Sequence, residues 1–116
     1  MKREKRARIV LVTCGSLAEG RKIARSVVEK RLAACVNMAL SPVESCYTWK
    51  GKQEVTREYL LMMKTTAARL RELEKEVKRL HSYEVPEFIA LPIAEGSEHY
   101  LAWLLESVAK PPRKSR

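Results

Sequence analysis

The chain has 116 residues, 46% of them hydrophobic, which suits one domain with a single modest core. Its formal net charge is +9, but residues 1–8 and 110–116 each carry +4, and the residues between them carry only +1. This distribution excludes a strongly basic body, and no stretch approaches the ~20 apolar residues of a membrane span. We expect one domain over residues 9–109, with a basic N-terminal tail over 1–8 and a basic C-terminal tail over 110–116.

The three cysteines, Cys14, Cys35 and Cys46, form no C-x-x-C pair and lie within or beside apolar runs. An odd number of cysteines in this pattern is typical of a reducing cytosol. The apolar run behind the basic N-terminus, residues 9–12, is too short for a secretory signal. We therefore expect a soluble, unprocessed, cytoplasmic protein.

The first predicted elements are a strand and a helix. Residues 9–12 are β-branched or leucine, which favours a strand covered on both faces, and residues 14–16 interrupt it. Ser16 and Glu19 have the spacing of a capping box, in which both side chains bind free amides of the first helical turn. Apolar residues then recur at three- and four-residue steps, which predicts a helix to about Arg31.

A long hairpin is predicted next. Residues 35–49 indicate one long strand bent or bulged at Pro42, because proline cannot donate to a strand ladder. Residues 50–52 form the turn, and residues 54–64 return as a strand that is apolar at both parities over 59–63. Each arm exceeds the ~5–6 residues of a usual strand, which points to oligomerisation.

The remainder adds a helix, a strand and a last helix. Thr66 is a plausible cap for a helix that ends near Leu80, and residues 88–91 form a strand closed by Pro92. Ser97 can cap a final helix that ends near Lys110. The order β-α-β-β-α-β with an added helix predicts an α+β, ferredoxin-like fold with both main helices on one face of an antiparallel sheet. We expect the last helix and neighbouring subunits to cover the other face.

Five motifs resemble those of the CutA family of divalent-cation-tolerance proteins. They are V-E-K-R-L-A-A-C-V-N at 28–37, Y-T-W-K-G-K at 47–52, M-M-K-T at 62–65, H-S-Y-E-V-P-E at 81–87 and Y-L-A-W at 100–103. The resemblance covers about residues 10–103 and departs at Ser82, where the family usually has proline. It implies a homotrimer of ferredoxin-like subunits, linked to divalent-metal tolerance, with copper binding in some members and no settled enzymatic activity.

For metal binding, the resemblance implies a cysteine on the first strand and two adjacent histidines. Those positions hold Val12, Leu80 and His81, so His81 is the one candidate ligand that remains, and Cys14 lies two residues beyond Val12. The alternative is that His81 only stabilises the end of a helix. No cofactor is assigned firmly; copper or another divalent metal is the candidate, with His81 as the first ligand and Cys14 as the weaker one.

The residues after His81 suggest a pocket. Glu84 and Glu87 beside Tyr83 could form an acid and base pair or receive a cation, or they could pair with basic groups across a subunit interface, Lys64 among them. By resemblance, an intersubunit cleft for a small ligand would also include Trp49, Lys64 and Trp103.

We interpret the chain as a homotrimeric metal- or small-ligand-binding or adaptor protein of the CutA type, and not as an enzyme. One alternative is a ferredoxin-like nucleic-acid-binding module that uses the basic tails, although the strand at 9–12 has no aromatic residue to stack on bases. The other is a small hydrolase of the same fold, for which no phosphate loop, Ser-His-Asp order or zinc-protease motif is present.

Overall fold

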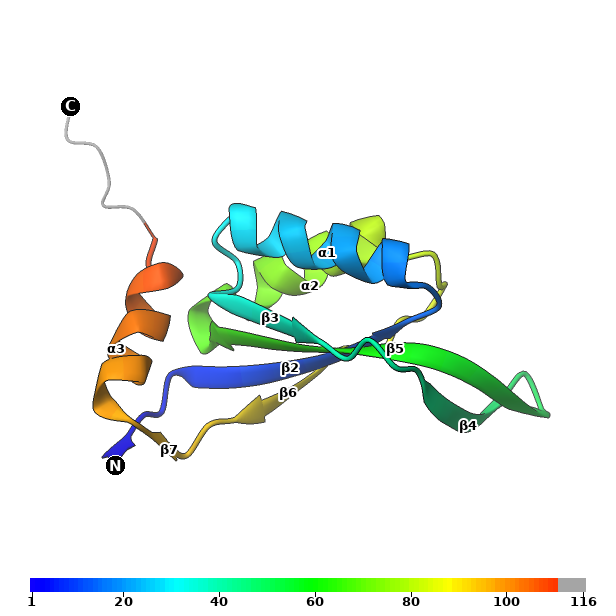
Figure 1. Ribbon diagram of the computed structural model, residues 1–116, viewed down its shortest axis with the longest axis horizontal. Coiled ribbons are helices and arrows are strands. Elements are labelled where there is room, and N and C mark those ends of the chain that lie inside the picture. The colour runs from blue at the N-terminus through cyan, green and yellow to red at the C-terminus, as the bar shows by residue number, and fades with distance from the viewer. Residues whose placement is uncertain (111–116) are drawn as a thin grey trace.

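The computed structural model of the protein describes residues 1–110. Figure 1 shows a twisted antiparallel sheet with helices α1 and α2 on one face and a long hairpin that projects beyond the helices. The elements are β1 (Lys2–Arg3), β2 (Ala7–Cys14), α1 (Leu17–Glu29), β3 (Cys35–Met38), β4 (Val43–Trp49), β5 (Lys52–Thr66), a 3-10 turn η1 (Ala67–Arg69), α2 (Leu70–Leu80), β6 (Ile89–Pro92), β7 (Glu95–Gly96) and α3 (Glu98–Ser107).

The sheet confirms the predicted ferredoxin-like fold. Its strand order is β3-β5-β2-β6, every pairing is antiparallel, and β4 pairs with the first part of β5. The expected single strand over residues 35–49 is two strands, because the ladder breaks between Met38 and Val43, around Pro42, which has no amide hydrogen. The hairpin turns at Lys50 and Gly51, both with positive φ (52° and 79°), as a tight two-residue hairpin turn requires.

The helix α1 begins as predicted and ends at an unusual residue. The Ser16 hydroxyl accepts a hydrogen bond from the Glu19 amide at 3.1 Å. The other half of the capping box is wrong, because the Glu19 carboxylate instead accepts from the Ser82 amide at 3.0 Å. Beyond the last turn, Arg31 has φ of 59°, and its guanidinium donates to the carbonyls of Glu106 and Ser107 at the end of α3.

The helix α2 begins later than predicted. Thr66 precedes the 3-10 turn η1 and makes no side-chain cap hydrogen bond, so its expected role as a cap is wrong. In contrast, Ser97 does cap α3, since its hydroxyl accepts from the Tyr100 amide at 3.2 Å.

The core lies between the sheet and helices α1 and α2. Side chains from β2 and β5 alternate, so every second residue meets the helices. This core also explains the apolar periodicity of both helices, whose inward positions are fully buried. Its buried members are Val10, Val12, Cys14, Ile23, Val27, Leu32, Ala33, Leu61, Met63, Leu73 and Val77.

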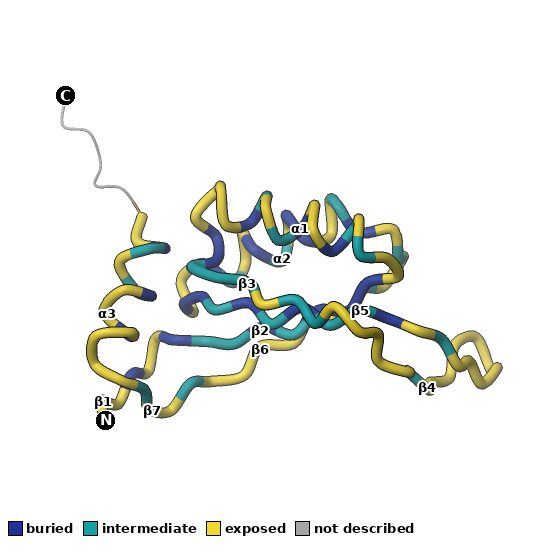
Figure 2. The backbone as a smooth tube through the Cα atoms, viewed as in Figure 1, coloured by how far each residue is buried: buried dark blue, intermediate teal, exposed yellow. Residues whose placement is uncertain are grey.

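The opposite face of the sheet is apolar but poorly covered in a single chain. Leu11 and Met62 are opposite each other on this face, and next to them Ile89 and Leu91 of β6 are 50% and 46% exposed. Helix α3 lies at one end of the sheet, where β2 begins and β5 ends, so it leaves the middle of this face open (Figure 1). Figure 2 shows the same contrast, with mostly exposed residues along β6 and the hairpin and buried residues in the strands beneath α1 and α2.

The two expected tails differ in what the structure describes. Residues 1–8 contain β1, which pairs with β7, and the start of β2. Between them, Glu4 is 6% exposed and its carboxylate accepts hydrogen bonds from Arg6. In the C-terminal segment, Lys110 pairs with Glu72 at 3.3 Å, and residues 111–116 lie outside the described residues.

Candidate functional site

A cavity of about 670 Å³ lies between the hairpin and the segment that follows α2. The hairpin supplies one wall, the end of β2 supplies the floor through Thr13, and residues 83–87 supply the other wall. The cavity is lined by Thr13, Ser45, Cys46, Tyr47, Trp49, Thr56, Glu58, Tyr83, Glu84, Val85 and Glu87.

The lining carries three carboxylates and no basic side chain, although the whole chain has a net charge of +9. Glu58 is only 5% exposed and takes part in no ion pair among residues 1–110. Burial and the negative charge of Glu58 together raise the pKa of Glu87. A buried charge is costly unless something compensates it, so the cavity favours a positively charged group.

Tyr83 lines the cavity together with the carboxylates. Its pKa is raised to about 12, first by burial and then by hydrogen bonding to Glu58 and the negative charge there. The phenol therefore stays protonated at neutral pH. Its hydroxyl also lies close over Gly15, where an added Cβ would come within 3.3 Å of the oxygen.

His81 holds this wall in place. Its side chain is fully buried, and its Nε2 lies 2.7 Å from the Thr13 carbonyl, so Nε2 carries the proton and donates. The Nδ1 atom accepts the amide hydrogen of Tyr83 at 3.0 Å. Because both ring nitrogens are engaged, the imidazole in this arrangement presents no free lone pair to a metal ion.

Glu19 completes the support from α1. One carboxylate oxygen accepts from the Ser82 amide, while the other lies 3.7 Å from His81 Nδ1 and has no hydrogen-bond partner among the described residues. Helix α1, the end of β2 and the segment after α2 therefore meet at His81, and this contact sets where Tyr83 points.

Cys14 is buried in the core between the sheet and helix α1. Burial, followed by the negative charge of Glu19, raises the pKa of its thiol to about 11. Metals bind the thiolate, and this environment keeps the thiol protonated. Within residues 1–110, no group of three or more His, Cys, Asp or Glu side chains is arranged to hold a metal ion.

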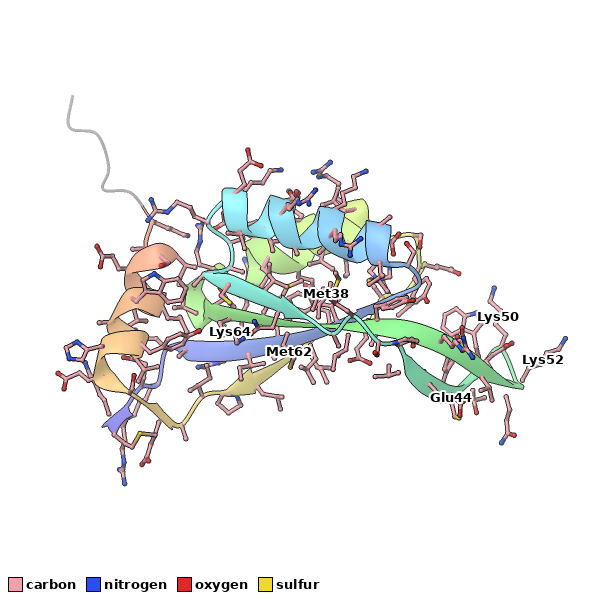
Figure 3. The ribbon with its side chains drawn as sticks, viewed as in Figure 1. Met38, Glu44, Lys50, Lys52, Met62 and Lys64 are labelled. Carbon is pink, nitrogen blue, oxygen red and sulfur yellow. The ribbon has the colours of Figure 1, made fainter. Side chains whose placement is uncertain are left out.

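The structure brings together Trp49, Tyr83, Glu84 and Glu87 of the predicted site, and it separates the rest. Lys64 is paired in the sheet with Ile9 and Cys35, and Figure 3 shows it well away from the hairpin tip at Lys50 and Lys52. Trp103 lies on α3, where the centre of its ring is 5.4 Å from the centre of the Tyr100 ring. Neither residue lines the cavity within one chain.

Sequence reasoning missed Glu58 and the link from Glu19. The signal for Glu58 was present, since it is the last charge before the apolar run at 59–63. Its burial depends on residues 83–87, which lie over it in the fold and are distant from it along the chain.

Comparisons with known proteins place these observations in a family. The CutA1 divalent ion tolerance protein family matches residues 8–107. The divalent-cation tolerance protein CutA of Thermus thermophilus is 48% identical over 99 residues, which are 85% of this chain and 95% of that protein. Protein CutA of Homo sapiens is 47% identical over 93 residues, 80% of this chain but only 51% of that protein.

Solved structures agree with the sequence matches. The CutA1 structure from Thermus thermophilus has a TM-score of 0.86 at 46% identity and covers 89% of this chain and 99% of that one. The CutA1 structure from Oryza sativa has a TM-score of 0.87 at 40% identity and covers 91% and 96%. Within residues 1–110, no helix is long and apolar enough to cross a membrane. With its sequence and fold both matched over most of its length, the chain belongs to the CutA1 divalent ion tolerance family.

Proposed function

We propose that the protein is a homotrimeric binding protein of divalent-cation tolerance, in which the acidic cavity lies at the contact between subunits. The observation that carries this proposal is a cavity with three carboxylates and no base, walled by a hairpin that is largely exposed in one chain. On that hairpin, Tyr47, Trp49 and Val55 are 44%, 40% and 64% exposed. Exposed aromatic and aliphatic side chains of this kind mark a contact surface.

The apolar sheet face supports the same assembly. Ile89 and Leu91 on β6 are half exposed beside Leu11 and Met62, and burying them against other subunits would remove that apolar area from water. Lys64 lies on this face too, so in the proposed assembly it would also lie at the contact between subunits.

Binding, without catalysis, suits the groups that line the cavity and those that support its wall. His81 uses both ring nitrogens within the chain, and the pKa of the Cys14 thiol is raised, so neither forms an activated nucleophile and base pair. The acidic lining also disfavours phosphate groups, which argues against the nucleic-acid alternative.

A role for metal requires ligands from more than one chain. His81 and Cys14 are the ligands predicted from the sequence for copper or another divalent metal. Within one chain both ring nitrogens of His81 are engaged, the Cys14 thiol is held protonated, and no third convergent ligand lies within residues 1–110. Equilibrium dialysis with copper and with zinc, on wild type and His81→Ala, tests this part. Equal metal binding by both proteins, or none by either, would remove His81 from the proposal.

We also propose a cytoplasmic location, supported by the three free cysteines. The Arabidopsis thaliana relative is named chloroplastic and the Archaeoglobus fulgidus structure is named periplasmic, so family members differ in compartment.

Sedimentation equilibrium at micromolar concentration tests the assembly. We expect a trimer for the wild type and dissociation for Leu91→Arg, which places a charge on the apolar sheet face. Val28→Arg is the matched control, because Val28 is 40% exposed on α1 and lies away from that face. A monomeric wild type, or equal effects of the two variants, would refute the proposed interface.

A further inference from the structure

We propose that the acidic cavity binds a small organic cation that carries two or more ammonium groups on an aliphatic chain, the chemistry of a diamine or polyamine. This inference rests on the proposed function only in placing the cavity at a subunit contact. It adds the class of ligand, which neither the family nor its relatives' names supply.

The charge of the cavity calls for a cation with more than one donor group. Glu58 is more than nine-tenths buried, faces the cavity and has no cationic partner among the described residues. Glu84 and Glu87 line the opposite wall nearer to solvent, and Glu87 lies close enough to Glu58 to sense its charge. One carboxylate at depth and two near the rim can accept N–H donors from ammonium groups at separate points along one chain.

Size and donor geometry favour an organic cation over a bare metal ion. Calcium and magnesium need six or more oxygens at about 2.0–2.6 Å, and no group of three acidic or other metal-ligating side chains converges in this way within residues 1–110. The cavity volume of about 670 Å³ lies in the range of sites for small organic molecules.

The wall of the cavity suits an aliphatic chain that carries positive charge. Trp49, Tyr47 and Tyr83 line the cavity, and aromatic rings attract ammonium groups and also pack against methylene groups. The chain itself shows this chemistry, since the Lys50 ammonium lies 5.9 Å from the centre of the Trp49 ring. Neutral acceptors for N–H donors are added by the hydroxyl groups of Thr13, Ser45 and Thr56.

Isothermal titration calorimetry of the full chain with spermidine and with putrescine tests the inference. We expect saturable binding that Glu58→Gln weakens roughly tenfold or more, the effect of losing a charge-assisted hydrogen bond. Trp49→Leu should weaken it roughly threefold to tenfold by removing the aromatic face. Glu44→Gln is the matched control, because Glu44 is an exposed carboxylate on the same hairpin outside the cavity lining and should leave affinity unchanged.

Two further titrations distinguish an amine site from a general apolar or metal site. A neutral diol of the same length as putrescine should not bind, and magnesium or calcium chloride should bind more weakly than either amine. The inference would be overturned if neither amine bound, if Glu58→Gln bound the amines as tightly as the wild type, or if the metal salts bound more tightly than the amines. Sedimentation of the same samples keeps the two proposals apart: a trimer that fails to bind amines overturns only the ligand class, whereas a monomer overturns the proposed assembly.

Discussion

Glu76 joins the two helices that cover the sheet, and replacing it with glutamine offers a quantitative test of the fold. Its carboxylate accepts hydrogen bonds from Ser26 Oγ at 2.5 Å and Lys30 Nζ at 2.9 Å, both on or just beyond α1. Within α2 it also accepts from Arg79 Nε and Nη2 at 2.8 and 2.7 Å. Its side chain is 8% exposed, so water cannot readily replace these donors.

The magnitude follows from how exposed each donor is. Lys30 and Arg79 are 52% and 58% exposed, so each pairing is worth only about 0.2–1 kcal/mol. The bond from Ser26 to a buried carboxylate is worth about 1.5 kcal/mol. Glutamine keeps the shape and one acceptor oxygen, so we expect Glu76→Gln to lower the free energy of unfolding by about 2 kcal/mol at neutral pH.

The pH dependence adds an independent check. Hydrogen bonds from Arg79, Ser26 and Lys30 hold the pKa of Glu76 far below its ordinary value of 4.5. The unfolded chain therefore takes up a proton first, and the stabilisation is complete above pH 4.5 and is lost as the pH falls below it. The difference between wild type and Glu76→Gln should shrink over that acid range.

Urea unfolding at fixed protein concentration, followed by circular dichroism, measures both effects. Glu74→Gln is the control, because Glu74 also lies on α2 but pairs only with exposed Lys78 at 3.5 Å, and should cost less than about 0.5 kcal/mol. Equal losses in the two variants, or a difference that persists unchanged in acid, would refute the assigned role of Glu76.

Three further predictions concern single residues. Glu87→Gln should raise the melting temperature at pH 7 and leave it unchanged below pH 4.5, because the raised pKa of Glu87 means that its ionisation destabilises the folded state. A lower melting temperature of the variant at pH 7 would contradict this. Arg31→Gly should be more stable than Arg31→Ala by about 1 kcal/mol in urea unfolding, because only glycine relieves φ of 59°; the reverse order would contradict this. Gly20→Ala should cost about 1–3 kcal/mol despite alanine's helix propensity, because its Cβ would lie 2.6 Å from Met38 Sδ; a stabilised variant in thermal melts would contradict this.

Local patterns were sufficient to predict most of the fold. Ser16 and Ser97 cap their helices because a hydroxyl needs only a neighbouring amide, which sequence spacing specifies. The hairpin turn at Lys50 and Gly51 is similarly local. The break near Pro42 was located, although the two strands that it separates were expected to be continuous.

The site was harder to predict because it depends on contacts between distant segments. Glu19 has the spacing of a capping box, yet its carboxylate binds the Ser82 amide, 63 residues away. Glu58 is buried by residues 83–87, which come after α2 in the chain, so the neighbours of Glu58 in the sequence do not reveal its surroundings. Trp103 was grouped with the cavity by resemblance alone, and Lys64 by resemblance and as a basic partner for Glu84 and Glu87. Neither lines the cavity within one chain, so only another subunit could bring them there.

Cys46 gives the cavity a chemical reporter of its own. Of the three cysteines, Cys46 is the exposed one, and it lines the cavity. Cys14, in contrast, is buried, and the pKa of its thiol is raised. A thiol reagent should therefore modify Cys46 much faster than Cys14, and its rate of reaction will depend on what occupies the space beside it. Protection of this thiol would reveal an occupant in a cell extract before that occupant had been identified.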